Sequence, residues 1–257
     1  FSMTNTAQPS LQARPKAPRP APDAINPWRP RPSFARSAAP PRPDPLLTKS
    51  NCPACGAGIQ FSSSVSLTAV CAQCRTLVIR KDLNIATLGK VAQLQDDGSP
   101  LRLGVVGQYQ GATFVVVGRI QMKYDGGYWS EWHIGLSDGR SGWLGESMGQ
   151  YMISFESDLD GPAPALAALE PGSAVQINGK ELTVKNIDQA SYFSAEGELP
   201  DDVPFGKETT LVDLAGEGGK FATLDFSESP PTLYEGEYAT LDSLRPMGMK
   251  PLEGWPR

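Results

Sequence analysis

The four cysteines of this chain stand in two closely spaced pairs, and no other feature of the sequence restricts the fold as strongly. Cys52 and Cys55 form one C-x2-C pair, and after fifteen further residues Cys71 and Cys74 form the second. Each pair can turn tightly and present two thiolates, so that four sulfurs surround one metal ion as a tetrahedron. The spacing predicts a zinc ribbon over residues 49–82, with one structural Zn2+ as the cofactor.

A closed four-sulfur site leaves no coordination position for water or substrate, which indicates a structural rather than a catalytic metal. Disulfides and rubredoxin-type iron are the alternatives that the cysteines leave open. Disulfides are disfavoured because no apolar segment typical of a signal peptide opens the sequence. No run of eighteen apolar residues is present either. We therefore expect a cytoplasmic protein, with peripheral contact to the inner membrane or to a membrane protein as a further option.

Residues 1–48 differ from the rest of the chain in composition. Half of the 24 prolines lie in the first 45 residues, and residues 1–50 carry eight Lys or Arg against two acidic residues, a balance of +6. The other 207 residues carry fifteen Lys or Arg against 26 Asp or Glu, a balance of −11. A segment of this kind buries too little apolar surface to offset the entropy of ordering. The sequence predicts a disordered, Pro-rich basic arm on an acidic body.

From residue 101 onward, short β-rich runs alternate with turn signals. Gln110-Gly111 and Asn178-Gly179 each stand between two β runs and predict a hairpin. A second hairpin follows in each half, at Asp138-Gly139 and at Gly218-Gly219. This weak internal repeat predicts a mainly β protein with two related small β-barrel-like (SH3-like) units, although one joint core is equally compatible with it. The units would span residues 84–157 and 171–245, followed by a C-terminal tail over 246–257.

Two segments of this β region carry expectations of their own. Leu88, Val91 and Leu94 recur at helical spacing, which predicts a short amphipathic helix over residues 84–96 that leads into the first unit. The second half carries an insertion near residues 191–207 that is rich in Gly, Pro and acidic residues. This composition predicts a loop.

The segment from Leu88 to Ser157 combines glycines, aromatic residues and acids in a recognisable pattern: Gly104, Gly107, Gly111, Phe114, Gly118, Arg119, Gly127, Trp129, Glu131, Trp132, Asp138, Gly139, Trp143, Leu144, Glu146, Gly149 and Tyr151. It resembles the bacterial family DUF4178, a domain of unknown function. Val212-Asp-Leu and Gly219-Lys-Phe-Ala-Thr-Leu-Asp resemble the second copy, so the resemblance covers roughly residues 50–245. It implies no activity; it implies an accessory protein of a membrane-linked or stress/polyamine-related bacterial system.

Several aromatic and acidic side chains of the first unit are candidates for a binding groove. In a strand, Trp132 faces away from Glu131 and from His133, the only histidine of the chain. Most of these rings are needed to fill the core of a small β unit. Half-exposed rings beside carboxylates would nevertheless attract a cation or a peptide. The candidate groove residues are Trp129, Glu131, Trp132, Trp143 and Glu146.

No nucleophile motif accompanies His133, and we predict no catalytic residue. The leading hypothesis is a non-enzymatic zinc-ribbon adaptor with a protein partner. The alternative is nucleic-acid binding through the ribbon and the basic arm, which the charge of −11 on the rest of the chain opposes. An enzyme with its site in the aromatic groove is a third hypothesis. No small-molecule substrate is indicated by the sequence.

Overall fold

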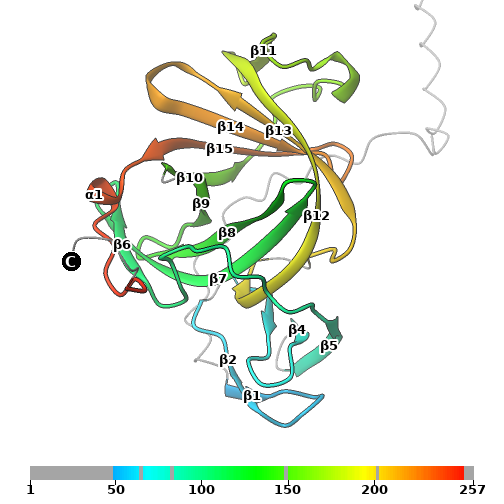
Figure 1. The fold of residues 1–257 in the computed structure, drawn as a ribbon, viewed down its shortest axis with the longest axis vertical. Coiled ribbons are helices and arrows are strands. Elements are labelled where there is room, and N and C mark those ends of the chain that lie inside the picture. The colour runs from blue at the N-terminus through cyan, green and yellow to red at the C-terminus, as the bar shows by residue number, and fades with distance from the viewer. Residues whose placement is uncertain (1–48, 64–65, 82–83, 148–149, 201–202, 252–257) are drawn as a thin grey trace, which may run out of the picture. The chain divides into compact units, whose positions relative to one another are not determined.

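The fold is given by a computed structural model, which describes residues 49–251 apart from 64–65, 82–83, 148–149 and 201–202. All described residues belong to one compact unit within Pro43–Arg257 (Figure 1). The predicted arm over 1–48 and residues 252–257 of the predicted tail lie outside the described residues. Among the described helices, none has the length and apolar character needed to cross a membrane.

The described part of the chain is mainly β, as the β-rich runs and turn signals of the sequence predict, and its strands pair antiparallel. Two short 3-10 turns, Leu166–Ala168 and Glu217–Gly219, and one helical turn, α1 (Leu241–Leu244), accompany them. The strands are β1 (Lys49–Asn51), β2 (Gly58–Gln60), β3 (Thr68–Val70), β4 (Thr76–Lys81), β5 (Asn84–Lys90), β6 (Val106–Tyr109), β7 (Ala112–Tyr124), β8 (Gly127–Leu136), β9 (Ser141–Ser147), β10 (Gln150–Ser157), β11 (Ala174–Ile177), β12 (Lys180–Leu199), β13 (Glu208–Ala215), β14 (Lys220–Asp225) and β15 (Thr232–Ala239).

The two halves of the β region share one sheet. Strands β7 to β10 form an antiparallel meander, and β12 to β15 form a second one. The meanders join on both sides, because β10 pairs with β15 and the later part of β12 pairs with β7. The pairings therefore form a cycle of eight strands, β7-β8-β9-β10-β15-β14-β13-β12, which curls into a barrel (Figure 1). The β3-β4-β5 part of the ribbon extends the same sheet through β3 and β12.

The four turns predicted from Gly-containing dipeptides lie between strands. In the hairpin β6–β7, Gln110 and Gly111 both have positive φ angles, 48° and 84°. Asn178 and Gly179 repeat this geometry between β11 and β12, with 49° and 72°. Two successive positive φ angles match the twist of the flanking strands, which is why such dipeptides fix a hairpin locally.

The helix predicted over residues 84–96 is wrong. Residues 84–90 form strand β5, which pairs with β4. The following segment is held in an extended form by the side chain of Gln121, whose Oε1 accepts from the Gln95 N–H at 2.7 Å and whose Nε2 donates to the Gln95 carbonyl at 2.9 Å. The leucine at position 88 remains 42% exposed. Pairing with β4 satisfies backbone hydrogen bonds of residues 84–90, and the apolar residues at helical spacing do not form one face of a helix.

The loop predicted over residues 191–207 is wrong in its first half. Strand β12 continues to Leu199, and its residues 192–197 pair with β7. Only the part that follows this strand leads as a loop into β13. The insertion thus supplies the contact that closes the cycle of strands.

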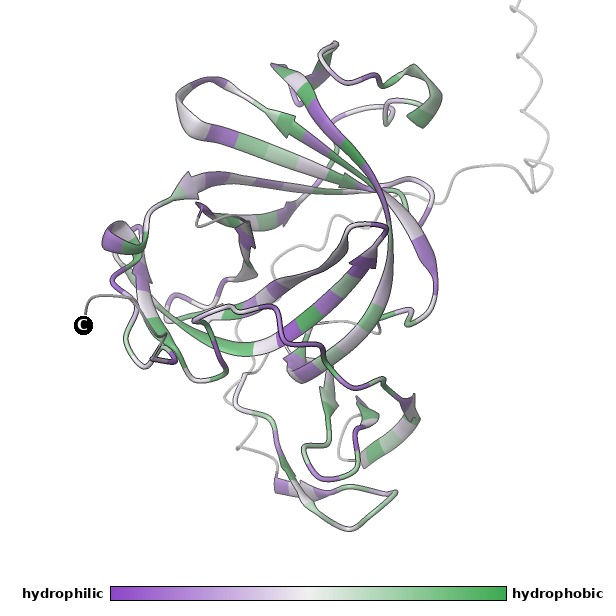
Figure 2. Cartoon of the chain, viewed as in Figure 1, coloured by the Kyte–Doolittle hydropathy of each residue, from purple (hydrophilic) through white to green (hydrophobic). Residues whose placement is uncertain are grey.

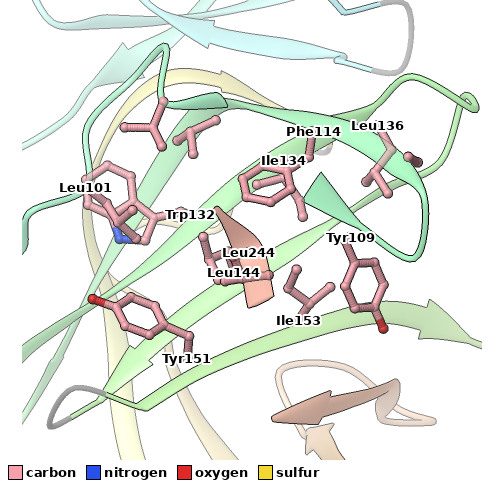
Figure 3. Packing of buried hydrophobic residues seen from close by; sticks show 13 residues of the cluster. Leu101, Tyr109, Phe114, Trp132, Ile134, Leu136, Leu144, Tyr151, Ile153 and Leu244 are labelled. Atoms are coloured by element: carbon pink, nitrogen blue, oxygen red, sulfur yellow. The ribbon is translucent and has the colours of Figure 1, made fainter. Parts of the chain in front are cut away.

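Alternation along the strands separates two hydrophobic clusters from a shared inner face. One cluster belongs to the first half and includes Trp132, Ile134 and Leu144, covered by Leu101 and Leu244 (Figure 3). The other belongs to the second half and includes the buried residues Val184, Val212, Leu214, Leu224 and Leu233. Hydrophobic and hydrophilic segments accordingly alternate along the strands (Figure 2). Each half therefore packs its own core on one face and turns the other face towards the barrel interior.

Candidate functional site

The two cysteine pairs lie in two turns with the same backbone hydrogen bonds. In each turn, the residue after the second cysteine has a left-handed conformation: Gly56 with φ +77° and Arg75 with φ +60°. Glycine adopts this conformation without strain, whereas arginine does so at a cost of about 1 kcal/mol. The bonds are Cys52 N to Ala57 O (2.7 Å), Gly56 N to Cys52 O (2.8 Å), Cys71 N to Thr76 O (2.9 Å) and Arg75 N to Cys71 O (2.8 Å).

These turns bring the four sulfurs together. All four Sγ atoms lie within 4.8 Å of one another, with 3.6 Å between Cys52 and Cys74 and 3.7 Å between Cys55 and Cys71. The cysteines are free thiols. Tetrahedral zinc with bonds of about 2.3 Å requires sulfurs about 3.8 Å apart, so the donor set fits such an ion. The four predicted ligands could thus hold one metal ion.

The environment of Cys74 favours its thiolate form. The hydroxyl and the backbone N–H of Thr76 lower the pKa of the Cys74 thiol to about 6. A hydrogen bond to the charged form of a thiol stabilises the form that binds metal. Thr76 therefore supports a metal ligand through its hydrogen bonds but is not itself a ligand.

The ribbon is fixed to the barrel through strand β12. The carboxylate of Glu198 accepts hydrogen bonds from the backbone N–H of Ser62 at 2.7 Å, from the Ser62 hydroxyl and from the backbone N–H of Ser63 at 3.0 Å. On the other side of the ribbon, the Arg75 guanidinium donates to Ser194 Oγ at 3.0 Å and to the carbonyl of Ala92. These bonds satisfy a carboxylate that is only 7% exposed.

The single histidine is a buried strand residue with both ring nitrogens in contact with protein. His133 Nδ1 lies 2.9 Å from the carbonyl of Glu198, and Nε2 lies 2.6 Å from Ser141 Oγ. Its ring packs against Trp143, with centroids 5.3 Å apart. These contacts give the side chain a positioning role between β8, β9 and β12.

A cavity of about 900 Å³ occupies the shared inner face of the two halves. Strands of both halves line it, because every second residue of β8, β9, β13 and β14 points inward. Its aromatic lining consists of Tyr124, Trp129, Trp143, Tyr192, Phe221 and Tyr234. Its carboxylates are Glu131, Glu146, Glu156, Asp188, Asp213, Asp225 and Glu228. No Lys, Arg or His is among the described lining residues, so the cavity is strongly acidic.

Four of the five predicted groove residues line this cavity: Trp129, Glu131, Trp143 and Glu146. The fifth, Trp132, is fully buried in the cluster of the first half, where the Arg119 guanidinium lies 4.8 Å from its ring centroid. Strand alternation explains the difference, since Trp132 faces away from its two neighbours in sequence.

Three carboxylates on the inner face, which we call the acidic trio, are Glu131, Asp213 and Asp188. Each receives one side-chain hydrogen bond, from Trp129 Nε1 to Glu131 (3.0 Å), from Thr223 Oγ1 to Asp213 (2.8 Å) and from Asn186 Nδ2 to Asp188 (2.5 Å). Within the described part of the chain, none of the three forms an ion pair.

Two members of the trio, Glu131 and Asp213, have raised pKa values. Burial, followed by the charge of Asp213, raises the pKa of Glu131 to about 7. Burial also raises the pKa of Asp213; the hydrogen bond from Thr223 opposes this shift, and the charge of Asp188 adds to it. Although protein surrounds Asp213 on most sides, its side chain is solvent-accessible, which places it on the wall of an open cavity. Both shifts favour the neutral carboxyl group, and no Lys, Arg or His among the described lining residues offsets them.

The sequence interpretation missed every contribution of the second half to this cavity. Asp213 stands between the core residues Val212 and Leu214, so its alternation was visible. The sequence does not reveal the pairing of β12 with β7 and of β10 with β15, which places the inner faces of the two halves opposite each other.

Glu146 differs from the trio, because its carboxylate accepts hydrogen bonds from Ser99 Oγ and from the Tyr151 hydroxyl at 3.2 Å.

Comparison with known proteins gives one result. No curated protein and no solved structure matches the chain. A family model described as "Domain of unknown function (DUF4178)" matches residues 102–240, more than half of the chain. This region includes β6 to β15, and therefore both halves of the barrel and all of the acidic trio. The chain belongs to the DUF4178 family.

Proposed function

We propose that this protein is a non-enzymatic accessory protein whose barrel cavity binds a positively charged group of a partner molecule. The observation that carries the proposal is the cavity itself: aromatic rings and seven carboxylates face one space, without a basic side chain among its described lining residues. Carboxylates in a low-dielectric site are stabilised by a cation, and ring faces add to this attraction.

The contacts around the histidine support a binding role rather than catalysis. A general base must be able to reach a proton on a bound substrate. His133 is fully buried, and its two nitrogens face the Glu198 carbonyl and the Ser141 hydroxyl. The titratable groups that line the cavity are carboxylates and tyrosines, and the Tyr192 hydroxyl is hydrogen-bonded to Asp225 at 2.5 Å.

The ribbon supports the same role as a rigid part of the platform. We propose that its metal is Zn2+, because four thiolates with tetrahedral spacing are the preferred donor set of structural zinc. All four coordination positions are filled by protein, so the ion would stabilise the fold. The bonds of Glu198 and Arg75 then transmit that rigidity to β12, one wall of the cavity.

Nucleic-acid binding through the ribbon is less well supported by the side-chain contacts. Arg75 is engaged with Ser194 and Ala92, and the Arg80 guanidinium lies 5.0 Å from the ring centroid of Phe61. Anisotropy of labelled DNA and RNA with the full chain at two salt concentrations distinguishes the two hypotheses. Tight binding that falls steeply with salt would replace the present proposal, because phosphate contacts release counterions.

The proposed function is tested with a short lysine-rich peptide and its glutamate-rich counterpart. We expect the full chain to bind the lysine peptide at low salt, and the double variant Glu131→Gln/Asp213→Asn to bind it at least tenfold more weakly. Glu217→Gln is the matched control, because it removes a negative charge from an exposed turn outside the cavity. Equal binding by the double variant and the wild type would contradict a cavity-based function.

A further inference from the structure

We propose that the ligand of the cavity is a small organic cation that joins an N–H-bearing ammonium or guanidinium group to an apolar chain or ring. The inference deepens the proposed function and rests on it. It assigns the charged head of the ligand to the acidic trio, Glu131, Asp213 and Asp188, and its apolar part to the neighbouring wall of the cavity.

The dimensions of the cavity favour a whole small molecule. Ligand pockets for small molecules occupy roughly 300–1,000 Å³ and combine apolar walls with a few placed polar groups. The present cavity, of about 900 Å³, has aliphatic wall residues from β7, β10 and β13, namely Ile120, Met122, Met152 and Leu211. Burying each CH2 group of a ligand against such a wall contributes about 0.8 kcal/mol. A bare inorganic cation would leave this surface uncovered.

The spacing of the carboxylates argues against a metal ion in the same place. Among the described residues, the four cysteines alone bring three or more ligand atoms close enough to share one ion. The trio comes from β8, β12 and β13, two of which belong to the second half. An organic cation with several N–H groups, or with a delocalised charge, can contact carboxylates that are too far apart to chelate a metal.

The type of positive group follows from the acceptors. Each trio carboxylate accepts one side-chain hydrogen bond in the described part of the chain, which leaves further lone pairs for N–H donors. A quaternary ammonium ion has no N–H group and would leave these acceptors unused. Beside Glu131, the ring of Trp129 meets that of Tyr124 edge to face, with centroids 5.2 Å apart, and offers an aromatic surface to the ligand.

Space for the head group is kept open by a glycine. Gly145, on β9, pairs with Glu131 on β8. A Cβ atom at position 145 would stand 3.1 Å from Glu131 Oε2 and 3.3 Å from the terminal methyl of Met152. Both neighbours are ends of flexible side chains, so Gly145→Ala is compatible with the fold but displaces the carboxylate. This substitution therefore tests the position of Glu131 without removing its charge.

The experiment uses the full chain at pH 8 and three probes: n-hexylammonium, 1-hexanol and tetramethylammonium. Binding is followed by saturation-transfer NMR and by tryptophan fluorescence. We expect n-hexylammonium to bind saturably, with 1-hexanol and tetramethylammonium each at least about tenfold weaker. Glu131→Gln, Asp213→Asn and Gly145→Ala should each weaken n-hexylammonium binding, by about tenfold for the two charge removals, while Glu217→Gln should leave it unchanged.

Three outcomes would overturn the inference. In the first, 1-hexanol binds as well as n-hexylammonium, so that charge has no part in recognition. In the second, tetramethylammonium binds as tightly as the N–H-bearing probe. In the third, the lysine-rich peptide binds through the trio but n-hexylammonium does not, which leaves the proposed function standing and removes only the small-molecule ligand. If neither the lysine-rich peptide nor n-hexylammonium binds, the proposed function fails together with the inference.

Discussion

The carboxylate of Glu198 accepts hydrogen bonds from both the backbone N–H and the hydroxyl of Ser62, which precedes it by 136 residues. The same residue offers its backbone carbonyl to His133 Nδ1. Glu198 therefore links three parts of the chain: the end of the ribbon, strand β12 and strand β8. The Glu198 side chain thus helps to fix the ribbon, together with the pairing of β3 with β12, because hydrogen bonds to a charged group are stronger than those between neutral groups.

Glu198→Ala should lower the free energy of unfolding by about 3 kcal/mol, since hydrogen bonds to a charged group contribute about 1.5–3 kcal/mol each and the backbone N–H groups of Ser62 and Ser63 lose their acceptor. Urea denaturation provides the measurement. Amide exchange at Ser62 and Ser63 should accelerate more than exchange in β14. Glu217→Ala, in an exposed turn, is the control. Unchanged exchange at the two serines would show that the ribbon is held elsewhere.

Purified protein should contain one equivalent of zinc, and Cys55→Ser should lose it. Three remaining sulfurs bind the ion more weakly, and binding to the folded state alone contributes RT ln(1 + [L]/Kd) to stability. Metal analysis and a thermal melt with and without chelator are the measurements. Gln73→Ser is the control, because it lies in the second turn and is exposed but provides no sulfur. Iron in place of zinc would contradict the proposed identity of the metal.

Gly118→Ala should destabilise the protein by about 3 kcal/mol or prevent it from folding, because overpacking a close contact forces the backbone apart. A Cβ atom at position 118 would stand 1.9 Å from the Glu198 carbonyl oxygen, at the pairing of β7 with β12. Gly58→Ala meets nothing within 4 Å and should change the melting temperature by less than about 2 °C. Similar melting temperatures for the two variants would contradict the observed closure of the barrel.

Stability should decrease as pH rises from about 5 to 8, through the ionisation of Glu131. Its pKa is raised from 4.5 to about 7 in the folded protein, so between these values the folded state binds more protons than the unfolded state. Glu131→Gln removes this dependence and should gain stability relative to wild type, by up to about 3 kcal/mol at pH 8. Denaturation curves of wild type and variant at pH 5 and at pH 8 measure this difference in stability. A difference between variant and wild type that does not change with pH would refute the assignment.

Acid should weaken a second, buried cluster. Asp97 Oδ2 lies 2.6 Å from Arg119 Nη2 and 2.5 Å from Ser130 Oγ. Burial opposes ionisation, but the Ser130 hydrogen bond and the Arg119 charge outweigh it and lower the pKa of Asp97. This contribution is complete above about pH 4 and is lost as pH falls through the lowered pKa.

Asp97→Asn should therefore cost about 3 kcal/mol at pH 7, because it leaves a buried guanidinium without its carboxylate. The difference from wild type should shrink at pH 3, and urea denaturation at the two pH values measures it. Asp96→Asn, one residue earlier in the chain and outside the ion pair, is the control. A constant difference at both pH values would show that the charge of Asp97 is not what stabilises the cluster.

The sequence by itself determined the features that depend on local geometry. Two cysteines separated by two residues can meet only in a tight turn, and Asn178-Gly179 favours two positive φ angles wherever it stands. The mainly β class also follows from local alternation. The internal repeat stays a prediction, although the two halves do order their strands alike. Periodicity over a few residues was a weaker guide: Leu88, Val91 and Leu94 have helical spacing but lie in and after strand β5.

The tertiary structure alone decided where the inner faces meet. Nothing near residues 192–197 shows that they would pair with β7, because a strand's partner depends on backbone groups far away in the sequence. That pairing and the one between β10 and β15 bring Glu131 within electrostatic reach of Asp213, 82 positions later. Each carboxylate alone is an ordinary strand residue. They form an acidic cavity because closing the barrel surrounds their charges with protein, and the described lining residues include no Lys, Arg or His.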